Sequence, residues 1–160
     1  MAHRLPILTH PDTFLRKKAL DVSAAELRDK EFLGFLEDMS KTMLEADGIG
    51  LAAIQVGDRR NITGINMDDG PMHFVNPKIL QYGKKKDVQT EGCLSVPGLA
   101  GDVRRSLEIH VTAIDRRGAA LDFTAHDLLA RVLQHEIDHL NGILYIDRAE
   151  KIWEEKPQKK

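Results

Sequence analysis

Two histidines of the sequence, His135 and His139, are four positions apart, and an acidic residue, Glu136, lies between them. Side chains at positions i and i+4 of an α-helix lie on the same face, so both imidazole rings can bind one divalent metal ion. The carboxylate of Glu136 can then reach a water molecule on that ion. His-Glu-x-x-His is a pattern of metal-dependent hydrolases. The alternative is an amphipathic helix with two incidental histidines, because short motifs also arise by chance.

The single cysteine, Cys93, is a second candidate for metal chemistry. Together with His135 and His139 it would complete a three-ligand site with one open position for water, which is the arrangement of catalytic metal sites. The alternative for Cys93 is a small buried hydrophobic residue, the commonest environment of a free cysteine. A lone cysteine cannot form an internal disulfide, and this fits a reducing compartment.

A third stretch, Gly48-Ile-Gly-Leu-Ala-Ala-Ile-Gln-Val-Gly57, combines glycines with apolar residues. It does not fit a nucleotide-binding loop, because it lacks a third glycine at the dinucleotide spacing and contains no Gly-Lys-Ser/Thr. On local evidence, a structural turn leading into an apolar strand explains the stretch as well as a binding loop does.

Taken together, the regions around these residues resemble the three motifs of the peptide deformylases, in the family's order and approximate spacing. The resemblance covers most of the chain and extends to Asn76-Pro77 and to Leu128-Leu-Ala-Arg131. It implies an enzyme that removes the N-formyl group from the initiator methionine of nascent proteins and releases formate. The matching stretches are Gly48-Ile-Gly-Leu-Ala-Ala-Ile-Gln55, Glu91-Gly-Cys-Leu-Ser95 and Gln134-His-Glu-Ile-Asp-His139.

The resemblance also implies a cofactor and catalytic residues. The implied cofactor is one Fe²⁺ ion per chain, with Zn²⁺, Ni²⁺ or Co²⁺ as substitutes. A bound ion of this kind lowers the pKa of water to about 7, and Glu136 can accept the released proton and later deliver it to the leaving amine. The implied stabilisers of the oxyanion are the backbone N–H of Leu94 and the side-chain amide of Gln55. The implied metal ligands are Cys93, His135 and His139.

Nascent chains vary beyond their first residue, so their recognition should rely on backbone more than on side chains. The resemblance implies that Ile49, Gly50 and Gly92 hydrogen-bond an extended N-formylmethionyl peptide, in the manner of strand addition. It also implies an apolar slot for the methionine side chain, and one helix face can form a wall of this slot because its residues are three and four positions apart. The implied slot residues are Ile49, Glu91, Leu128, Val132 and the ring of His135.

The sequence departs from the family pattern at Ala100, at Gly98, where some members carry Glu, and at its C-terminal end. Ala100 stands where many relatives carry an arginine that can meet distal parts of the substrate, so we do not expect that contact. Some relatives dock on the ribosome through a basic C-terminal helix, whereas this C-terminal end has mixed charge, which leaves only a transient ribosome contact open. Arg105 matches a later family arginine, and we expect it to form an ion pair within the fold. The acidic residues of the C-terminal end are Asp147, Glu150, Glu154 and Glu155.

The elements that position these residues follow from hydrophobic periodicity and capping signals. Ser23 and Glu26 form a capping-box pattern that predicts a helix ending near Ala46. A second helix lies inside the run Thr124 to Asn141, with Thr124 and Asp127 as a similar pattern. Residues Gly83–Asp87 are expected to form a loop with solvated lysines. The predicted strands are Asn61–Met67, Met72–Tyr82, Ser106–Ile114 and Ala119–Phe123.

Strands flanked by helices indicate an α+β fold. We expect antiparallel or mixed strands packed around a central metal-binding HExxH helix, with an N-terminal helix and a short C-terminal helix within Asp147–Lys160. The 160 residues, 42% of them hydrophobic and 30% charged, have ordinary globular composition. Residues 1–160 are therefore expected to form a single catalytic domain.

Charge and hydropathy limit the partners and the compartment. A net charge of -2 argues against a specific nucleic-acid partner. The N-terminal sequence shows neither a secretory nor a transit signal, and no apolar run approaches the roughly 20 residues of a membrane span. We therefore expect a cytoplasmic, bacterial-type enzyme without a membrane partner.

Two alternatives to a deformylase stay open at this stage. A metalloprotease, or another N-formyl amidase, could use the same helix, although Cys93 and Gln55 in their motif contexts favour deformylation. A metal-stabilised binding module without turnover is the alternative from a different class. Glu136 argues against it, because a structural metal site needs no general base.

Overall fold

The computed structural model describes residues 1–156 and has an α+β architecture, as the sequence predicts. Each pair of neighbouring strands in its two sheets is antiparallel. The α-helices in this part of the chain are α1 (Lys30–Glu45) and α2 (Asp127–Leu140). The five-stranded sheet has the order β1 (Gly50–Ala52), β2 (Ile62–Met67), β3 (Gly70–Tyr82), β6 (Glu108–Ile114) and β7 (Ala120–His126). The three-stranded sheet has the order β4 (Lys86–Glu91), β5 (Leu99–Ser106) and β8 (Lys151–Glu154).

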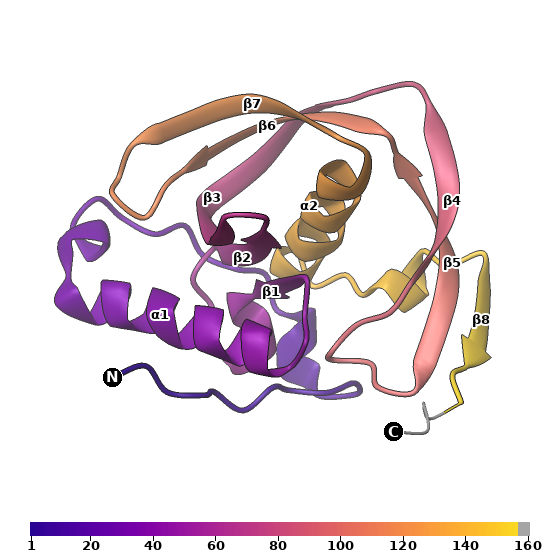
Figure 1. Ribbon diagram of the computed structural model, residues 1–160, viewed down its shortest axis with the longest axis horizontal. Coiled ribbons are helices and arrows are strands. Elements are labelled where there is room, and N and C mark those ends of the chain that lie inside the picture. Colours follow the sequence, from indigo (N-terminus) through magenta and orange to yellow (C-terminus); the bar gives the residue numbers. More distant parts are fainter. Residues whose placement is uncertain (157–160) are drawn as a thin grey trace.

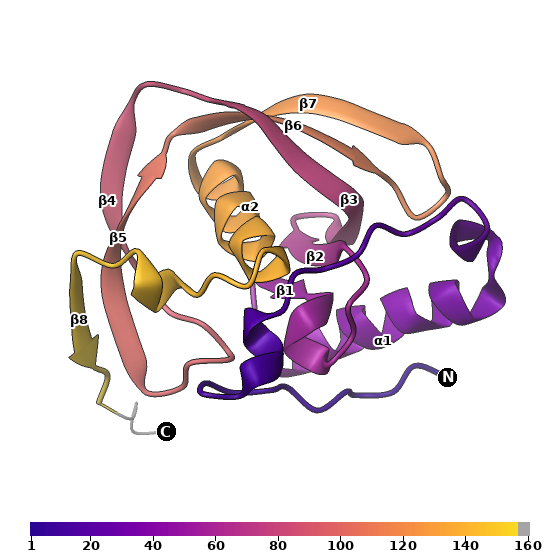
Figure 2. The same ribbon diagram turned by 180° about the vertical axis from the view of Figure 1, so that it is seen from behind.

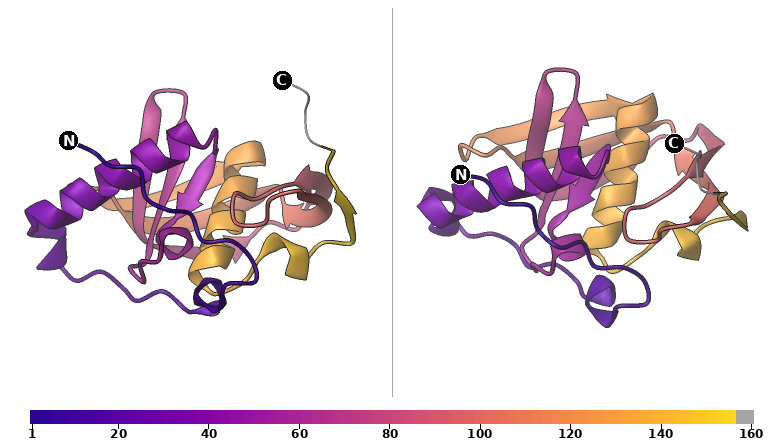
Figure 3. Two further views of the ribbon diagram at one scale, coloured as in Figure 1. Left: turned by 90° about the horizontal axis from the view of Figure 1, so that it is seen from below. Right: turned by 60° about the horizontal axis from the view of Figure 1, so that its bottom comes forward.

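The strands β3, β6 and β7 arch over α2, and the three-stranded sheet lies on its other side (Figure 1). α1 runs beneath β1 and β2, and the β2–β3 hairpin projects past it (Figure 3). Seen from behind, the N-terminal segment passes the C-terminal end of α2 (Figure 2). There the N–H of Ala19 donates to the carbonyl of Leu140 at 2.8 Å. Contacts from both sheets and from the N-terminal segment therefore fix the position of α2.

The N-terminal helix begins later than the sequence predicts. Ser23 and Glu26 form the expected reciprocal hydrogen bonds, but only a short 3-10 turn, Glu26–Arg28, follows them. α1 starts after Asp29, whose carboxylate accepts a hydrogen bond from the N–H of Glu31 at 3.0 Å. The extended backbone of Asp29 separates the two segments, so the prediction of one continuous helix from residue 23 is wrong.

The strands predicted at Asn61–Met67 and Met72–Tyr82 are present as β2 and β3, which pair as an antiparallel hairpin. The register of β3 against β6 shifts between Val75 and Lys78, because proline cannot donate to the ladder. Strand β6 begins at Glu108, and Ser106 instead ends β5. Of the predicted strand Ser106–Ile114, Ser106 therefore belongs to β5 and Leu107 lies between the two strands.

Two further predictions about the chain are wrong. Lys86 begins strand β4 and does not lie in a loop. The C-terminal segment forms no helix within the described residues, because Lys151–Glu154 is the strand β8. This strand pairs with β5, with Ala100 opposite Trp153, so a tertiary partner outweighs the local helix tendency. The rest of the predicted C-terminal helix, 157–160, lies outside the described residues.

α2 begins at Asp127, three residues later than the predicted capping pattern, because Thr124 still belongs to β7. Its residues Ala130 and Leu133 pack into the core cluster under the five-stranded sheet, and Leu140 packs into a second cluster. Burying a leucine side chain stabilises the fold by about 1.5–3 kcal/mol, so the helix resists displacement. Neither helix of the described chain has the length and continuous apolarity needed to span a membrane.

Candidate metal centre and substrate pocket

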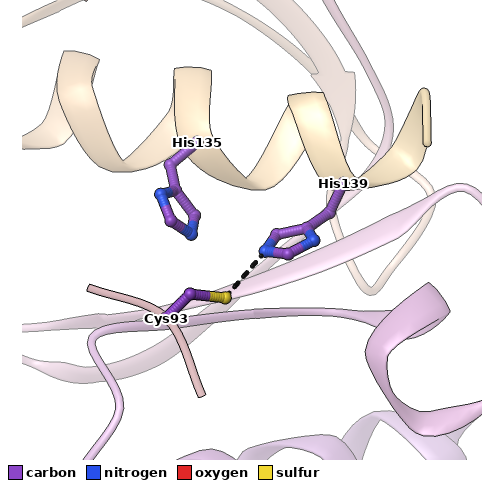
Figure 4. Close-up of side chains that lie close together, drawn as sticks. All are labelled: Cys93, His135 and His139. Atoms are coloured by element: carbon purple, nitrogen blue, oxygen red, sulfur yellow. Dashed lines mark hydrogen bonds between the residues drawn. The ribbon is translucent and has the colours of Figure 1, made fainter. Parts of the chain in front are cut away.

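The fold brings Cys93 next to His135 and His139. The potential ligand atoms of the three side chains all lie within 4.8 Å of one another. Cys93 Sγ is 3.2 Å from Nε2 of His139. The two rings extend from successive turns of α2 toward the sulfur, which comes from the segment between β4 and β5 (Figure 4).

The donor set fits one divalent transition-metal ion. Two imidazole nitrogens and a thiolate bind such ions at about 2.0–2.3 Å, so donors within 4.8 Å of one another can share an ion. Burial lowers the pKa of His139 well below its usual range, so this ring is in the neutral form that binds metal. Burial also lowers the pKa of His135, but hydrogen bonds to Cys93 and Glu91 outweigh it and raise the pKa to about 10. A metal ion that binds His135 would therefore displace a proton from the ring.

The carboxylate of Glu91 orients His135. Its Oε1 lies 2.7 Å from Nδ1 of His135, which leaves Nε2 as the ring nitrogen available to a metal ion. Arg105 donates two hydrogen bonds of 2.9 Å to the same carboxylate, and Arg131 donates a third of 2.7 Å. Burial alone would raise the pKa of Glu91, but the hydrogen bonds from Arg105 and His135 lower it to about 2.

This ion-pair network extends away from the metal donors. Arg105 also contacts Asp138 at 2.6 Å, so its expected role in an ion pair within the fold is confirmed. Arg131, to which the sequence analysis gave no role, contacts Asp87 at 2.7 Å. Its position four residues before His135, on the same helix face, was the available signal. The partner residues lie 14 to 44 positions away in the chain, so only the fold identifies them.

Glu136 is buried beside the three donors, with 4% of its surface exposed. Burial raises the pKa of its carboxyl group to about 7. Its Oε2 is buried without a hydrogen-bond partner within the described residues, and Glu136 lines the pocket described below. Gly50 packs directly against it: a Cβ atom at Gly50 would lie 2.5 Å from Oε1 of Glu136. This close approach gives a physical reason for one glycine of the Gly48–Gly57 stretch.

Gln55 lies in the 3-10 turn Ala53–Val56, with 1% of its surface exposed. Its Oε1 accepts a hydrogen bond from the N–H of Ala52 at 2.8 Å. Its Nε2 therefore faces the other way, 3.1 Å from Oγ of Ser95 and 3.6 Å from Sγ of Cys93. The side-chain amide thus presents its N–H donors to the metal donors, as an oxyanion stabiliser requires.

A pocket of about 500 Å³ opens onto these residues. It is bordered by β1 and β4, which are edge strands of their respective sheets. All six residues proposed from the sequence to bind substrate line it, together with Gln55, Cys93, Leu94, His135 and Glu136, whereas His139 is fully buried behind them. The six are Ile49, Gly50, Glu91, Gly92, Leu128 and Val132.

A buried carboxylate beside two imidazoles and a thiolate, at the end of a pocket, is typical of metal-dependent hydrolases. The profile of the polypeptide deformylase family matches residues 4–155. The peptide deformylase of Thermoanaerobacter pseudethanolicus is 45% identical over 138 residues, which cover 86% of this chain and 84% of that protein. Peptide deformylase 2 of Xanthomonas campestris is 43% identical over 159 residues, which cover 98% of this chain and 93% of that protein.

Solved structures of peptide deformylases also match this chain. The Met-Ala-Ser-bound class I type b peptide deformylase of Acinetobacter baumannii superposes with a TM-score of 0.89 at 32% identity, covering 92% of this chain and 99% of that one. The peptide deformylase of Thermotoga maritima superposes with a TM-score of 0.88 at 38% identity, and the match covers 93% of this chain and 99% of that one. The chain belongs to the polypeptide deformylase family. It is a metalloenzyme that removes the formyl group from the N-terminus of nascent peptides.

Proposed function

We propose that Cys93, His135 and His139 hold the metal ion of this deformylase and that Glu136 is its general base and general acid. The observation that carries the proposal is the convergence of three metal donors within 4.8 Å of one another beside a buried carboxylate. The proposed native ion is Fe²⁺, with Zn²⁺, Ni²⁺ or Co²⁺ as substitutes, since a Cys/His/His site accepts each of them. In this proposal the 160 residues act as one catalytic domain organised around α2.

When bound, the metal ion polarises the formyl carbonyl and makes a water molecule acidic enough to lose a proton near neutral pH. Glu136, which lines the pocket, accepts that proton on its carboxylate. The same carboxyl group then delivers the proton to the amine nitrogen as the C–N bond breaks, and formate and the free peptide leave. Glu91 keeps the ring of His135 in the orientation that ligation requires.

Gln55 and Leu94 are the proposed stabilisers of the oxyanion that forms on the formyl oxygen. The Gln55 amide is held by its own acceptor bond from Ala52, so its N–H groups need no reorientation during the reaction. Leu94 follows Cys93 directly and lines the same pocket. Losing one such donor typically costs about 3–4 kcal/mol of transition-state stabilisation.

The substrate is proposed to bind as an extended strand between β1 and β4. Both are edge strands that line the pocket, and an edge strand offers backbone groups for pairing. Backbone groups of Ile49, Gly50 and Gly92 would hold the peptide, and this suits substrates that differ beyond their first residue. The proposed slot for the methionine side chain is formed by Ile49, Glu91, Leu128, Val132 and His135.

The proposed place of action is the cytoplasm, on chains that leave the ribosome. A transient ribosome contact is part of this proposal. The exposed acidic residues Glu150 and Glu154 make a strong attraction between the C-terminal strand and RNA phosphates unfavourable.

The test of the proposed function measures formate released from formyl-Met-Ala-Ser by the nickel-loaded protein. The same preparation is offered unformylated Met-Ala-Ser and a longer unformylated peptide. We expect formate from the first substrate and no cleavage of the other two. Cleavage of internal peptide bonds without formate release would instead indicate an endoprotease.

A further inference from the structure

A second groove, of about 790 Å³, lies beside the last residues of β3. We call it the β3 groove. It is lined by the segment 18–21, by β3 between Pro77 and Tyr82, and by Ile137 and Leu140 of α2. None of the described residues that line it also lines the substrate pocket. The β3 groove is therefore a separate feature of the fold.

Hydrogen bonds hold the segment 18–21 beside β3. The carbonyl of Leu20 accepts from the N–H of Asn61 at 2.8 Å. The side chain of Asn76, in β3, accepts from the N–H of Val22 at 2.8 Å and donates to its carbonyl at 2.9 Å. The view from behind shows this part of the chain running past the end of α2 (Figure 2). The groove is thus built by fixed segments of the chain.

The last residues of β3 have one unpaired edge. β2 pairs with β3 only as far as Val75, whereas β6 pairs with β3 up to Tyr82. Asn61, which directly precedes β2, lines the β3 groove, so the groove lies on the β2 side of β3. Within residues 1–156, no backbone hydrogen bond joins 78–82 to a segment other than β6. Such an edge offers backbone donors and acceptors to an added strand.

The side chains of the groove are apolar or cationic for the most part. Its exposed large apolar side chains, each 57–59% exposed, are Leu20, Leu80 and Tyr82. Its charged side chains are the cations Lys18, Arg59 and Lys78 and one carboxylate, Asp21. The carboxylate accepts a hydrogen bond from the amide of Asn61 at 2.8 Å, and none of the three cations forms an ion pair within residues 1–156. A net positive groove on a chain of net charge -2 favours an anionic ligand.

We propose that the β3 groove binds an extended segment of another protein that carries acidic and apolar side chains, and that this segment adds a strand to β3. Its backbone pairs with the free edge, which is the general mode of strand addition. Its apolar side chains cover Leu20 and Leu80, and its carboxylates meet the unpaired cations. A nucleic acid would also attract the cations, but it would leave the strand edge unpaired. The proposal does not depend on the proposed function of the metal site.

The test measures fluorescence polarisation of a labelled hexapeptide, acetyl-Val-Glu-Val-Glu-Val-Glu-amide, with the nickel-loaded protein. We expect it to bind about 10-fold more tightly than the same peptide with lysine in place of glutamate. N-methylation of its backbone removes the N–H donors and should abolish binding. Amide hydrogen exchange at 78–82 should slow when the peptide is present. Excess Met-Ala-Ser should not displace the peptide, because the β3 groove is separate from the substrate pocket.

Charge reversal identifies the groove as the binding site. The double variant Lys18→Glu, Lys78→Glu should bind the glutamate peptide about 10-fold more weakly and should prefer the lysine peptide. Lys30→Glu, Lys151→Glu is the matched control: it makes the same charge change at exposed positions that do not line the groove, and should keep the wild-type preference. Both variants should release formate from formyl-Met-Ala-Ser at the wild-type rate, which shows that they are folded.

Four results would overturn the proposal: no binding of the glutamate peptide, its displacement by Met-Ala-Ser, equal binding of the N-methylated peptide, or an unchanged preference in Lys18→Glu, Lys78→Glu. Two further results would assign the groove to another occupant and overturn it as well. Protection of 78–82 by an oligouridine but not by the peptide would indicate RNA. Protection that rises with protein concentration alone would indicate a second copy of this chain.

Discussion

At the scale of single residues, the proposed metal donor His135 is held by partners that the sequence does not place next to it. Glu91 was expected from the sequence only as a slot residue, yet its carboxylate also accepts hydrogen bonds from His135, Arg105 and Arg131. The donors Cys93, His135 and His139 could be proposed from residue type, spacing and resemblance. The arginines could not, because ion pairing depends on which distant strands become neighbours.

The first residue-scale prediction concerns Glu136→Gln. This variant should keep its metal ion, because Glu136 is not among the proposed ligands, and should lose about 10²–10⁴-fold in kcat, because an amide cannot accept the proton of water. Mass spectrometry checks the metal content, and formate release by the same preparation checks kcat. A kcat near the wild-type value would show that another group is the general base.

The second concerns Gln55→Leu. The hydrogen bond from the Gln55 amide strengthens as charge develops on the formyl oxygen, so kcat should fall by about 10²-fold or more while KM changes little. Steady-state kinetics with formyl-Met-Ala-Ser separate the two constants. A change confined to KM would assign Gln55 to ground-state binding.

At the scale of elements, the sequence predicted helices and strands that local residue patterns determine. It did not predict elements whose type depends on pairing with a distant segment of the chain. The end of α1 near Ala46 and the strands β2 and β3 follow from capping signals and periodicity, and both are present. The helix expected at the C-terminal end is the strand β8, because β5 offers it a pairing edge. The start of α1 was misplaced because Asp29 caps the helix more directly than Ser23.

A pair of glycine substitutions tests how tightly these elements meet. Gly50→Ala would place a methyl group 2.5 Å from Oε1 of Glu136, so it should lower kcat by displacing that carboxylate. Gly34→Ala is the control: nothing lies within 4 Å of the added Cβ in the middle of α1. It should stabilise the protein by about 0.5–1 kcal/mol and leave kcat unchanged. A Gly50→Ala enzyme with normal kcat would show that β1 does not constrain Glu136.

At the scale of the whole molecule, buried titratable groups couple stability to pH. His73 belongs to β3 and is buried, and Oγ of Ser40 in α1 lies 3.0 Å from its Nε2. Burial, with a smaller effect of Arg116, lowers its pKa from 6.5 to about 4. Above pH 6.5 the ring is neutral in both the folded and unfolded states and contributes nothing. Between pH 6.5 and 4 only the unfolded state binds the proton, so stability falls as the pH is lowered.

We therefore predict that His73 by itself lowers the free energy of unfolding by about 3 kcal/mol between pH 7 and pH 4. This contribution is measured as the difference between the wild-type protein and His73→Gln, because the raised pKa of Glu136 acts in the opposite direction. Urea unfolding of the nickel-loaded protein at several pH values measures this slope. His73→Gln keeps a hydrogen-bonding side chain and removes the titration, so it should flatten the slope between pH 6.5 and 4. Glu91, whose pKa is lowered to about 2, loses its stabilising contribution only at lower pH. An identical slope in His73→Gln would assign the acid sensitivity to other groups.

The central claim is that one metal ion is held by a sulfur and two imidazole nitrogens of this chain. X-ray absorption spectroscopy at the nickel edge, on protein reloaded to one ion per chain, tests it most directly. The prediction is a first shell with one sulfur scatterer and two imidazoles, in which Cys93→Ser removes the sulfur and His139→Ala removes one ring. A wild-type shell without sulfur, or one that Cys93→Ser leaves unchanged, would contradict the claim.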